Sequence, residues 1–73
     1  MEQPRISVLD VVALLEDRPA QGLVRSQVGT VAERLDDDVF EIEFSDEDGR
    51  TYAEVALQAD ALLVLHHRPV RAA

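Results

Sequence analysis

The chain has 73 residues, which is enough for one small domain and leaves little room for a deep active-site cleft. Fifteen Asp and Glu residues stand against seven Arg and no Lys, so the formal net charge is −8 at pH 7. That charge repels phosphate backbones and anionic membrane surfaces, and it therefore disfavours nucleic acid and membranes as partners. Cysteine is absent, which excludes disulfides, a thiol nucleophile and cysteine-based metal sites.

No repeat or linker divides the chain, so we predict a single domain over residues 1–73. The ordered core is expected over about residues 7–66, with frayed tails at residues 1–6 and 67–73. Its apolar runs are far shorter than the roughly 20 residues that cross a bilayer, and the first residues lack the pattern of a secretory signal. These features predict a cytoplasmic location.

The first expected element covers residues 10–15, which are apolar and partly β-branched. A short helix is an alternative, because Ser7 and Asp10 have the spacing of a capping box in outline. Such a helix would have to end before Pro19, and the short length favours a strand.

A long polar loop and a second strand are expected next. Residues 16–27 contain Pro, Gly and several charged residues, which is typical of an irregular loop, with Leu23 or Val24 tucked beneath it. Residues 28–35 read as a strand in which Gly29 marks a bulge or a close approach of two backbones.

The clearest pattern lies at residues 39–44, after an acidic turn at residues 36–38. Apolar and acidic residues alternate there with period two, which predicts a half-buried strand. The inward residues are Phe40, Ile42 and Phe44, and the outward residues are Glu41 and Glu43.

Residues 45–50 contain an Asp-Gly pair, which predicts a hairpin, and residues 51–57 form its second strand. If Phe44 faces Thr51 across the loop, alternate residues of the second strand face the core. Those inward residues are Ala53, Val55 and Leu57, and Tyr52 and Glu54 then point outward beside Glu41 and Glu43.

One helical turn at residues 58–60 and a buried strand at residues 61–65 complete the expected elements. Five short strands, with one helical turn before the last, are typical of an all-β fold. We therefore predict a small, partly open SH3-like barrel.

The chain resembles a family of short bacterial domains of unknown function over roughly residues 8–66. The resemblance is carried by residues 9–17, 22–23, 28–31, 44–51 and 62–65. The stretch around Gly29 is also similar to the second strand of SH3-like barrels, including KOW modules of translation and transcription proteins. The basic residues of the KOW pattern are missing, which disfavours binding to RNA or DNA. In size and charge the chain is similar to antitoxin and immunity proteins.

Eight of the thirteen residues from position 36 to 48 are acidic, and we interpret this run as a docking face for a basic protein. A tyrosine among carboxylates suits an Arg or Lys side chain. The expected partner-binding residues are Asp36, Asp37, Asp38, Glu41, Glu43, Tyr52 and Glu54. A solvated acidic surface with no partner is the alternative.

We expect no enzymatic activity, no catalytic residue, no metal site and no cofactor. The serines lie in no nucleophile elbow, and the adjacent His66 and His67 would point to opposite faces of a strand. A weak divalent-ion site at the acidic turns is an alternative.

The predicted function is therefore that of a protein-binding module, with an antitoxin or immunity-type inhibitor as its most concrete form. A structural domain that forms homo-oligomers through its sheet edges is the alternative function.

Overall fold

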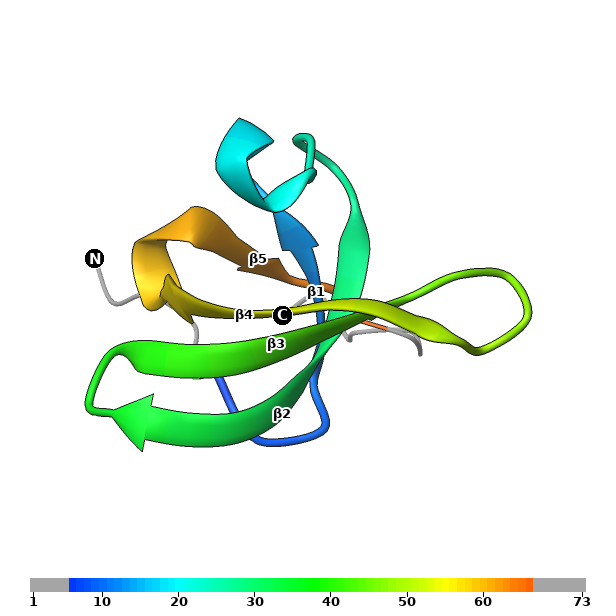
Figure 1. Ribbon diagram of the computed structural model, residues 1–73. Helices are drawn as coiled ribbons and strands as arrows, with labels where there is room; N and C mark the ends of the chain where they lie inside the picture. The colour runs from blue at the N-terminus through cyan, green and yellow to red at the C-terminus, as the bar shows by residue number, and fades with distance from the viewer. Residues whose placement is uncertain (1–5, 67–73) are drawn as a thin grey trace.

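The computed structural model describes residues 6–66 and is built from β-strands (Figure 1). Its elements are β1 (Val11–Leu14), the 3-10 helix η1 (Pro19–Gln21), β2 (Val28–Asp36), β3 (Val39–Ser45), β4 (Thr51–Gln58), the 3-10 helix η2 (Ala59–Ala61) and β5 (Leu62–Val64). The five strands form one antiparallel sheet in the order β4-β3-β2-β1-β5. The predicted all-β fold, with one helical turn before the last strand, is confirmed. Residues 10–15 contain a strand, so the helical alternative is wrong.

The core lies on one side of this sheet, which curls around it. On β3 the buried residues are Phe40, Ile42 and Phe44, as the alternating pattern predicted. The other buried apolar side chains are Val12 and Leu14 of β1, Leu23 of the long loop, Val31 of β2, Leu57 of β4, Ala61 of η2 and Leu62 of β5. Because β4 and β5 end the sheet and do not pair with each other within residues 6–66, the arrangement is a partly open, barrel-like sheet. Ile6, which the sequence placed in a tail, packs against this core.

The curl of the sheet is concentrated in the long strand β2, which Figure 1 shows bending across the molecule. Its pairing with β3 shifts between Val31 and Glu33 and again between Arg34 and Asp36. Such bulges bend a strand and increase its twist. Gly29 lies at neither shift. A β-carbon there would be 2.9 Å from the Glu43 backbone carbonyl oxygen and 2.7 Å from the Ile42 side chain, so the predicted close approach is confirmed.

The loop between β1 and β2 is irregular, as predicted, and it is anchored from within. Leu23 is buried while Val24 is exposed, so one apolar side chain of the loop joins the core. The backbone N–H groups of Arg18 and Leu23 each donate to the other residue's carbonyl oxygen, and the Asp17 carboxylate accepts from the Arg25 N–H at 2.9 Å. These contacts close the loop on itself above the core.

The β3–β4 hairpin has a register that differs from the prediction by two residues. Phe44 pairs with Ala53 rather than with Thr51, and Thr51 pairs with Ser45. The extra residue is Tyr52, which forms a bulge. Because a shift of two residues preserves the alternation beyond the bulge, the inward side of β4 is still the predicted one.

Candidate functional site

The outward side of β2, β3 and β4 carries four glutamates, which we call the acidic face: Glu33, Glu41, Glu43 and Glu54. Glu33 pairs directly with Glu41, and Glu43 pairs directly with Glu54. Residues that pair directly in an antiparallel sheet point to the same face, with β-carbons about 5 Å apart. The acidic face therefore holds two like-charged pairs on three neighbouring strands.

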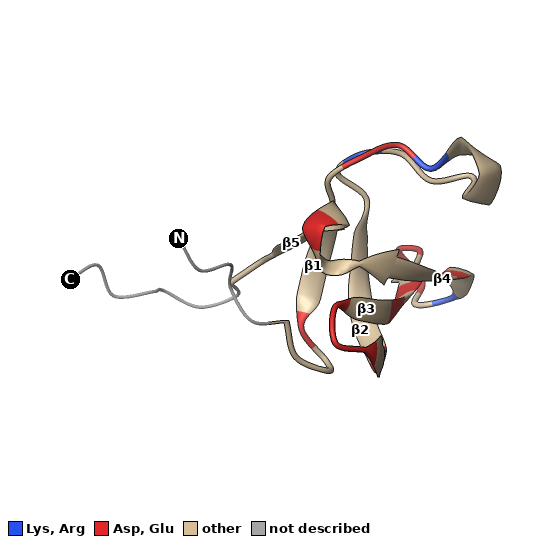
Figure 2. Ribbon diagram, turned by 90° about the vertical axis from the view of Figure 1, so that its left-hand side faces the viewer, with Lys and Arg blue, Asp and Glu red and all other residues tan. Residues whose placement is uncertain are grey.

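Within residues 6–66, no arginine forms an ion pair with any of these four glutamates. The ion pairs in this part of the chain join Arg18 to Glu16 and Arg34 to Asp37. Among the described residues, one side-chain hydrogen bond reaches the face: the Thr51 hydroxyl donates to the Glu43 carboxylate at 2.6 Å. Figure 2 shows acidic residues on and around β2, β3 and β4, with the visible arginines confined to loops. No arginine within residues 6–66 therefore neutralises the negative charge of the acidic face through an ion pair.

Glu33 is a member of the acidic face that the sequence did not indicate. Strict alternation from the buried Val31 would point Glu33 toward the core. The register shift after Val31 makes Ala32 the extra residue and turns Glu33 to the side of Glu41. A charged residue at an expected inward position is itself a signal for a bulge, and that signal was available in the sequence.

Tyr52 does not lie among the glutamates, so its predicted placement is wrong. Its ring centroid is 6.4 Å from that of the buried Phe44, and its hydroxyl accepts a hydrogen bond from the Gln27 side chain at 3.0 Å. The bulge reverses the alternation at this end of β4, so that Thr51 takes the outward position beside Glu43. Tyr52 instead packs at the rim of the core, with about half of its surface exposed.

The acidic turn at residues 36–38 lies at one end of the acidic face, where β2 connects to β3. Arg34 reaches back over it, donating to the Asp36 carbonyl at 3.2 Å and approaching the Asp37 carboxylate at 3.3 Å. The Asp36 carboxylate accepts the Asp37 N–H at 2.8 Å, and the Asp38 carbonyl accepts the Ala59 N–H at 2.7 Å. The turn is thus held by its own contacts and is partly neutralised by one arginine.

The comparison with protein families decides where this chain belongs. A family model described as a domain of unknown function, DUF4926, matches residues 8–64. The chain belongs to the DUF4926 family. This confirms the predicted resemblance to a family of unknown function. No curated protein and no solved structure matches the chain, so the likeness to SH3-like barrels stays a prediction.

The placement of His, Asp and Glu side chains over residues 6–66 was compared with what a metal ion needs. In that range, no three His, Asp or Glu side chains gather closely enough to hold an ion. The acidic turn, where a weak divalent site was the alternative, is included in that range. His66 is exposed at the end of the described chain, and His67 lies outside the described residues. The same range contains no helix that is long and apolar enough to span a membrane.

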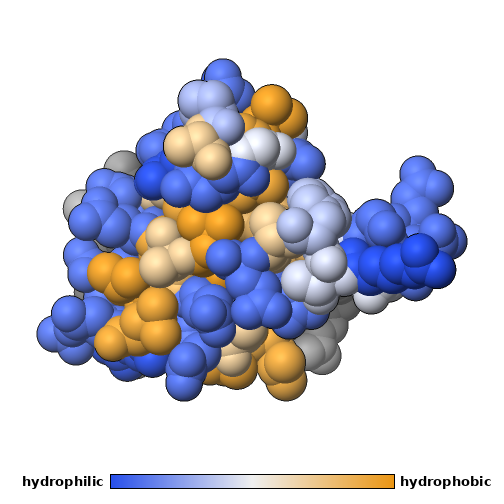
Figure 3. Space-filling view, in the orientation of Figure 1, coloured by the Kyte–Doolittle hydropathy of each residue, from blue (hydrophilic) through white to orange (hydrophobic). Residues whose placement is uncertain are grey.

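A second surface of the DUF4926 domain is apolar, and it lies on the other half of the outward side of the sheet. Val11 of β1 pairs with Thr30 of β2, which in turn pairs with Glu43 of β3. The outward side chains therefore change from apolar on β1 to acidic on β3. On the apolar half, Leu15, Val28 and Leu63 are each between 40% and 49% exposed. In Figure 3 the hairpin loop that projects at the right is hydrophilic, while apolar groups reach the surface elsewhere in that view.

Proposed function

We propose that this domain is a non-enzymatic, protein-binding module whose acidic face docks a basic protein. The observation that carries the proposal is the pairing of Glu33 with Glu41 and of Glu43 with Glu54. Like charges opposite each other destabilise a strand pair, so the free domain bears a cost that cationic side chains of a partner would relieve. The acidic turn at residues 36–38 extends the negative surface at one end, and Tyr52 is not part of it.

The most concrete form of this proposal is an antitoxin or immunity-type inhibitor that acts in the cytoplasm. A small acidic domain can cover the basic surface with which a larger protein binds nucleic acid. A concentrated field of one sign also speeds the encounter with such a partner. The net charge of −8 on 73 residues supports this form of the proposal.

The test is a binding experiment with charge-reversed variants. The tagged domain is incubated with a lysate of its source, and bound proteins are eluted by raising the salt to about 0.5 M, where exposed charge pairs are screened. The basic protein recovered is then purified and titrated against the domain. The double variant Glu41→Lys with Glu43→Lys should weaken this complex by at least about tenfold and flatten its salt dependence.

The matched control is the double variant Glu47→Lys with Asp48→Lys, which makes the same charge change in the exposed hairpin loop. It should weaken the complex much less, because these residues lie off the acidic face. Equal losses for the two double variants would show that only net charge matters. Unchanged affinity of the Glu41 and Glu43 variant would contradict the proposed face.

A further inference from the structure

The loop that joins β3 to β4 projects from the body of the domain into solvent, at the right of Figure 1. Residues 46–50 of this loop are all exposed, and Figure 3 shows the projecting loop as hydrophilic. The loop contains the pair Asp48-Gly49, and Asp48 is the one of the eight aspartates in the chain that is followed by glycine. This pair carries a reaction in which the acidic face has no part.

An aspartate followed by glycine can isomerise without an enzyme. The glycine backbone nitrogen attacks the side-chain carboxyl carbon, a C–N bond forms, and the carboxyl hydroxyl leaves as water with the proton of that nitrogen. Water then opens the five-membered succinimide ring that results. Opening at the side-chain carbonyl restores aspartate, whereas opening at the main-chain carbonyl gives isoaspartate, in which the main chain runs through the former side chain. Each step releases or consumes one water molecule, so the mass of the chain is unchanged.

Gly49 presents its nitrogen for this attack with little steric hindrance. It has no side chain, and nothing lies within 4 Å of the position that a β-carbon would take. Its φ of +80° is a left-handed conformation, which glycine adopts without strain and which the turn requires. The glycine that allows the hairpin to close therefore also leaves Asp48 open to ring closure.

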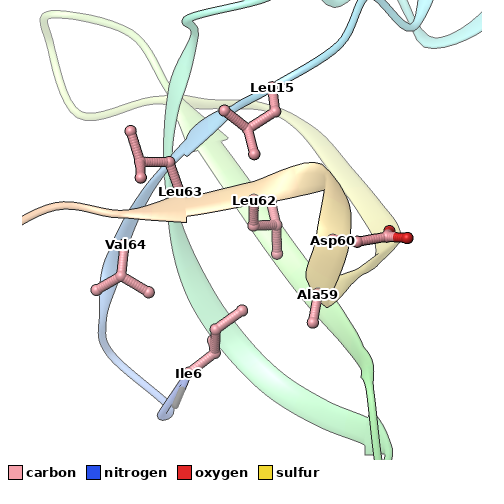
Figure 4. A pocket seen from close by; sticks show the side chains of 7 residues that line it. All are labelled: Ile6, Leu15, Ala59, Asp60, Leu62, Leu63 and Val64. Carbon is pink, nitrogen blue, oxygen red and sulfur yellow. The ribbon is translucent and has the colours of Figure 1, made fainter. Parts of the chain in front are cut away.

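The other aspartates of the described chain lack this combination. Asp10 and Asp38 each precede a valine, whose branched side chain crowds the backbone nitrogen. Asp60 borders a shallow, mostly apolar depression of about 120 Å³, and its carboxylate points away from the apolar side chains there (Figure 4). The next residue, Ala61, is buried, so its backbone nitrogen is shielded from such an attack.

Asp46 restrains the Asp48-Gly49 pair within the turn. Its carboxylate accepts the Asp48 N–H at 2.9 Å and the Arg50 N–H at 3.0 Å, and its carbonyl oxygen accepts the Gly49 N–H at 3.0 Å. The Gly49 nitrogen can attack only when the last of these bonds is open. Hydrogen bonds in an exposed loop open more readily than those of core strands. The rate of ring closure therefore depends on how firmly Asp46 holds the turn.

We propose that Asp48 is a modification site, at which ring closure by the Gly49 nitrogen converts aspartate to isoaspartate in the folded domain, at a rate that the Asp46 carboxylate limits. The reaction needs water and no other reactant. The product adds one main-chain atom to the ring that the hydrogen bond between Gly49 and Asp46 closes, so the turn between β3 and β4 must rearrange. This chemistry belongs to the free chain and does not rest on the docking of a basic protein.

The test follows the purified full chain over several weeks at physiological temperature and neutral pH. Trypsin cleaves after arginine, so it releases residues 35–50 as one peptide that contains Asp48 and four other aspartates. Isoaspartate leaves the mass of this peptide unchanged but alters its chromatographic retention, and electron-transfer fragmentation locates it. The isomer should accumulate at Asp48. It should stay at its starting level at the other four aspartates, which are Asp36, Asp37, Asp38 and Asp46.

Two variants separate the reaction from its restraint. Asp48→Glu keeps the charge but requires a six-membered ring, so accumulation of the isomer should fall by at least about tenfold. Asp46→Ala removes the carboxylate that accepts two N–H groups of the turn. It should raise the rate at Asp48 by about fivefold, the factor that corresponds to the loss of one ordinary hydrogen bond.

The matched control is Asp36→Ala, which removes the carboxylate that accepts the Asp37 N–H in the turn between β2 and β3. It should leave the rate at Asp48 unchanged. The proposal is overturned if no isomer accumulates at Asp48, or if the other four aspartates of the peptide isomerise equally fast. It is also overturned if Asp48→Glu reacts at the wild-type rate, or if Asp46→Ala and Asp36→Ala act alike. All of these outcomes are measured without a binding partner, so they are independent of the proposed function.

Discussion

Replacing Glu54 by lysine should make the free domain more stable and its docking weaker. Glu54 is exposed on β4 and pairs directly with Glu43 on β3. Glu54→Lys converts this repulsion into an attraction while leaving the hydrogen bond between Thr51 and Glu43 in place. The same change removes one of the four charges with which the acidic face would bind a basic partner.

The magnitude follows from the geometry of a directly paired position. Two unit charges about 6 Å apart in water interact by about 0.7 kcal/mol, before salt screening. Charge reversal removes this repulsion and adds an attraction of the same size, so the total change is twice the single interaction. Screening by salt reduces that total, and we expect the free energy of unfolding to rise by about 1 kcal/mol. For a domain of this size, that gain corresponds to an increase of about 4–8 °C in Tm.

The assay is urea and thermal unfolding followed by circular dichroism, at about 0.05 M and about 0.5 M salt. Glu47→Lys is the control, because it makes the same charge change in the exposed hairpin loop, away from Glu43. Glu54→Lys should raise the free energy of unfolding more than this control does. The difference between the two variants should become smaller at the higher salt concentration. An equal gain for both variants, or a gain indifferent to salt, would refute the reasoning from the Glu43–Glu54 pair.

Two further predictions concern residues that the structure places precisely. Gly29→Ala should lower the free energy of unfolding by about 2 kcal/mol in urea titrations, since the new methyl group would lie 2.7 Å from Ile42 and 2.9 Å from the Glu43 carbonyl oxygen; wild-type stability would contradict the close approach. Tyr52→Phe should leave the affinity for a basic partner unchanged, because the Tyr52 hydroxyl bonds to Gln27 at the rim of the core. A large loss of affinity in calorimetry would show that Tyr52 belongs to the binding surface.

The two halves of the outward side of the sheet differ in their surface chemistry. The half formed by β5, β1 and the start of β2 is apolar, with Leu15, Val28 and Leu63 exposed. The half formed by the rest of β2, β3 and β4 carries the acidic face. Because opposite surface chemistries suit different contacts, the apolar half is separate from the surface on which a basic protein would dock.

The sequence alone determined the strands, their order of appearance and most of the core. The alternation at residues 39–44 identified the inward side of β3, and the Asp-Gly pair identified the hairpin. These signals are local, since a period of two and a turn residue act within a few positions of the chain. Gly29 was also assigned correctly, because a glycine within a strand commonly marks a close approach of backbones.

Only the tertiary structure decided which charged side chains share a surface. The bulge after Val31 brought Glu33 onto the acidic face, and the bulge at Tyr52 moved that side chain away from it. Where a bulge forms depends on how strands must bend to enclose the core, and the sequence carries at most an indirect signal of it, such as the charge of Glu33 at an expected inward position. Likewise, the position of β5 at one end of the sheet follows from its pairing with the distant β1. Alternation along a strand is a property of the sequence, whereas register and strand order are properties of the packed sheet.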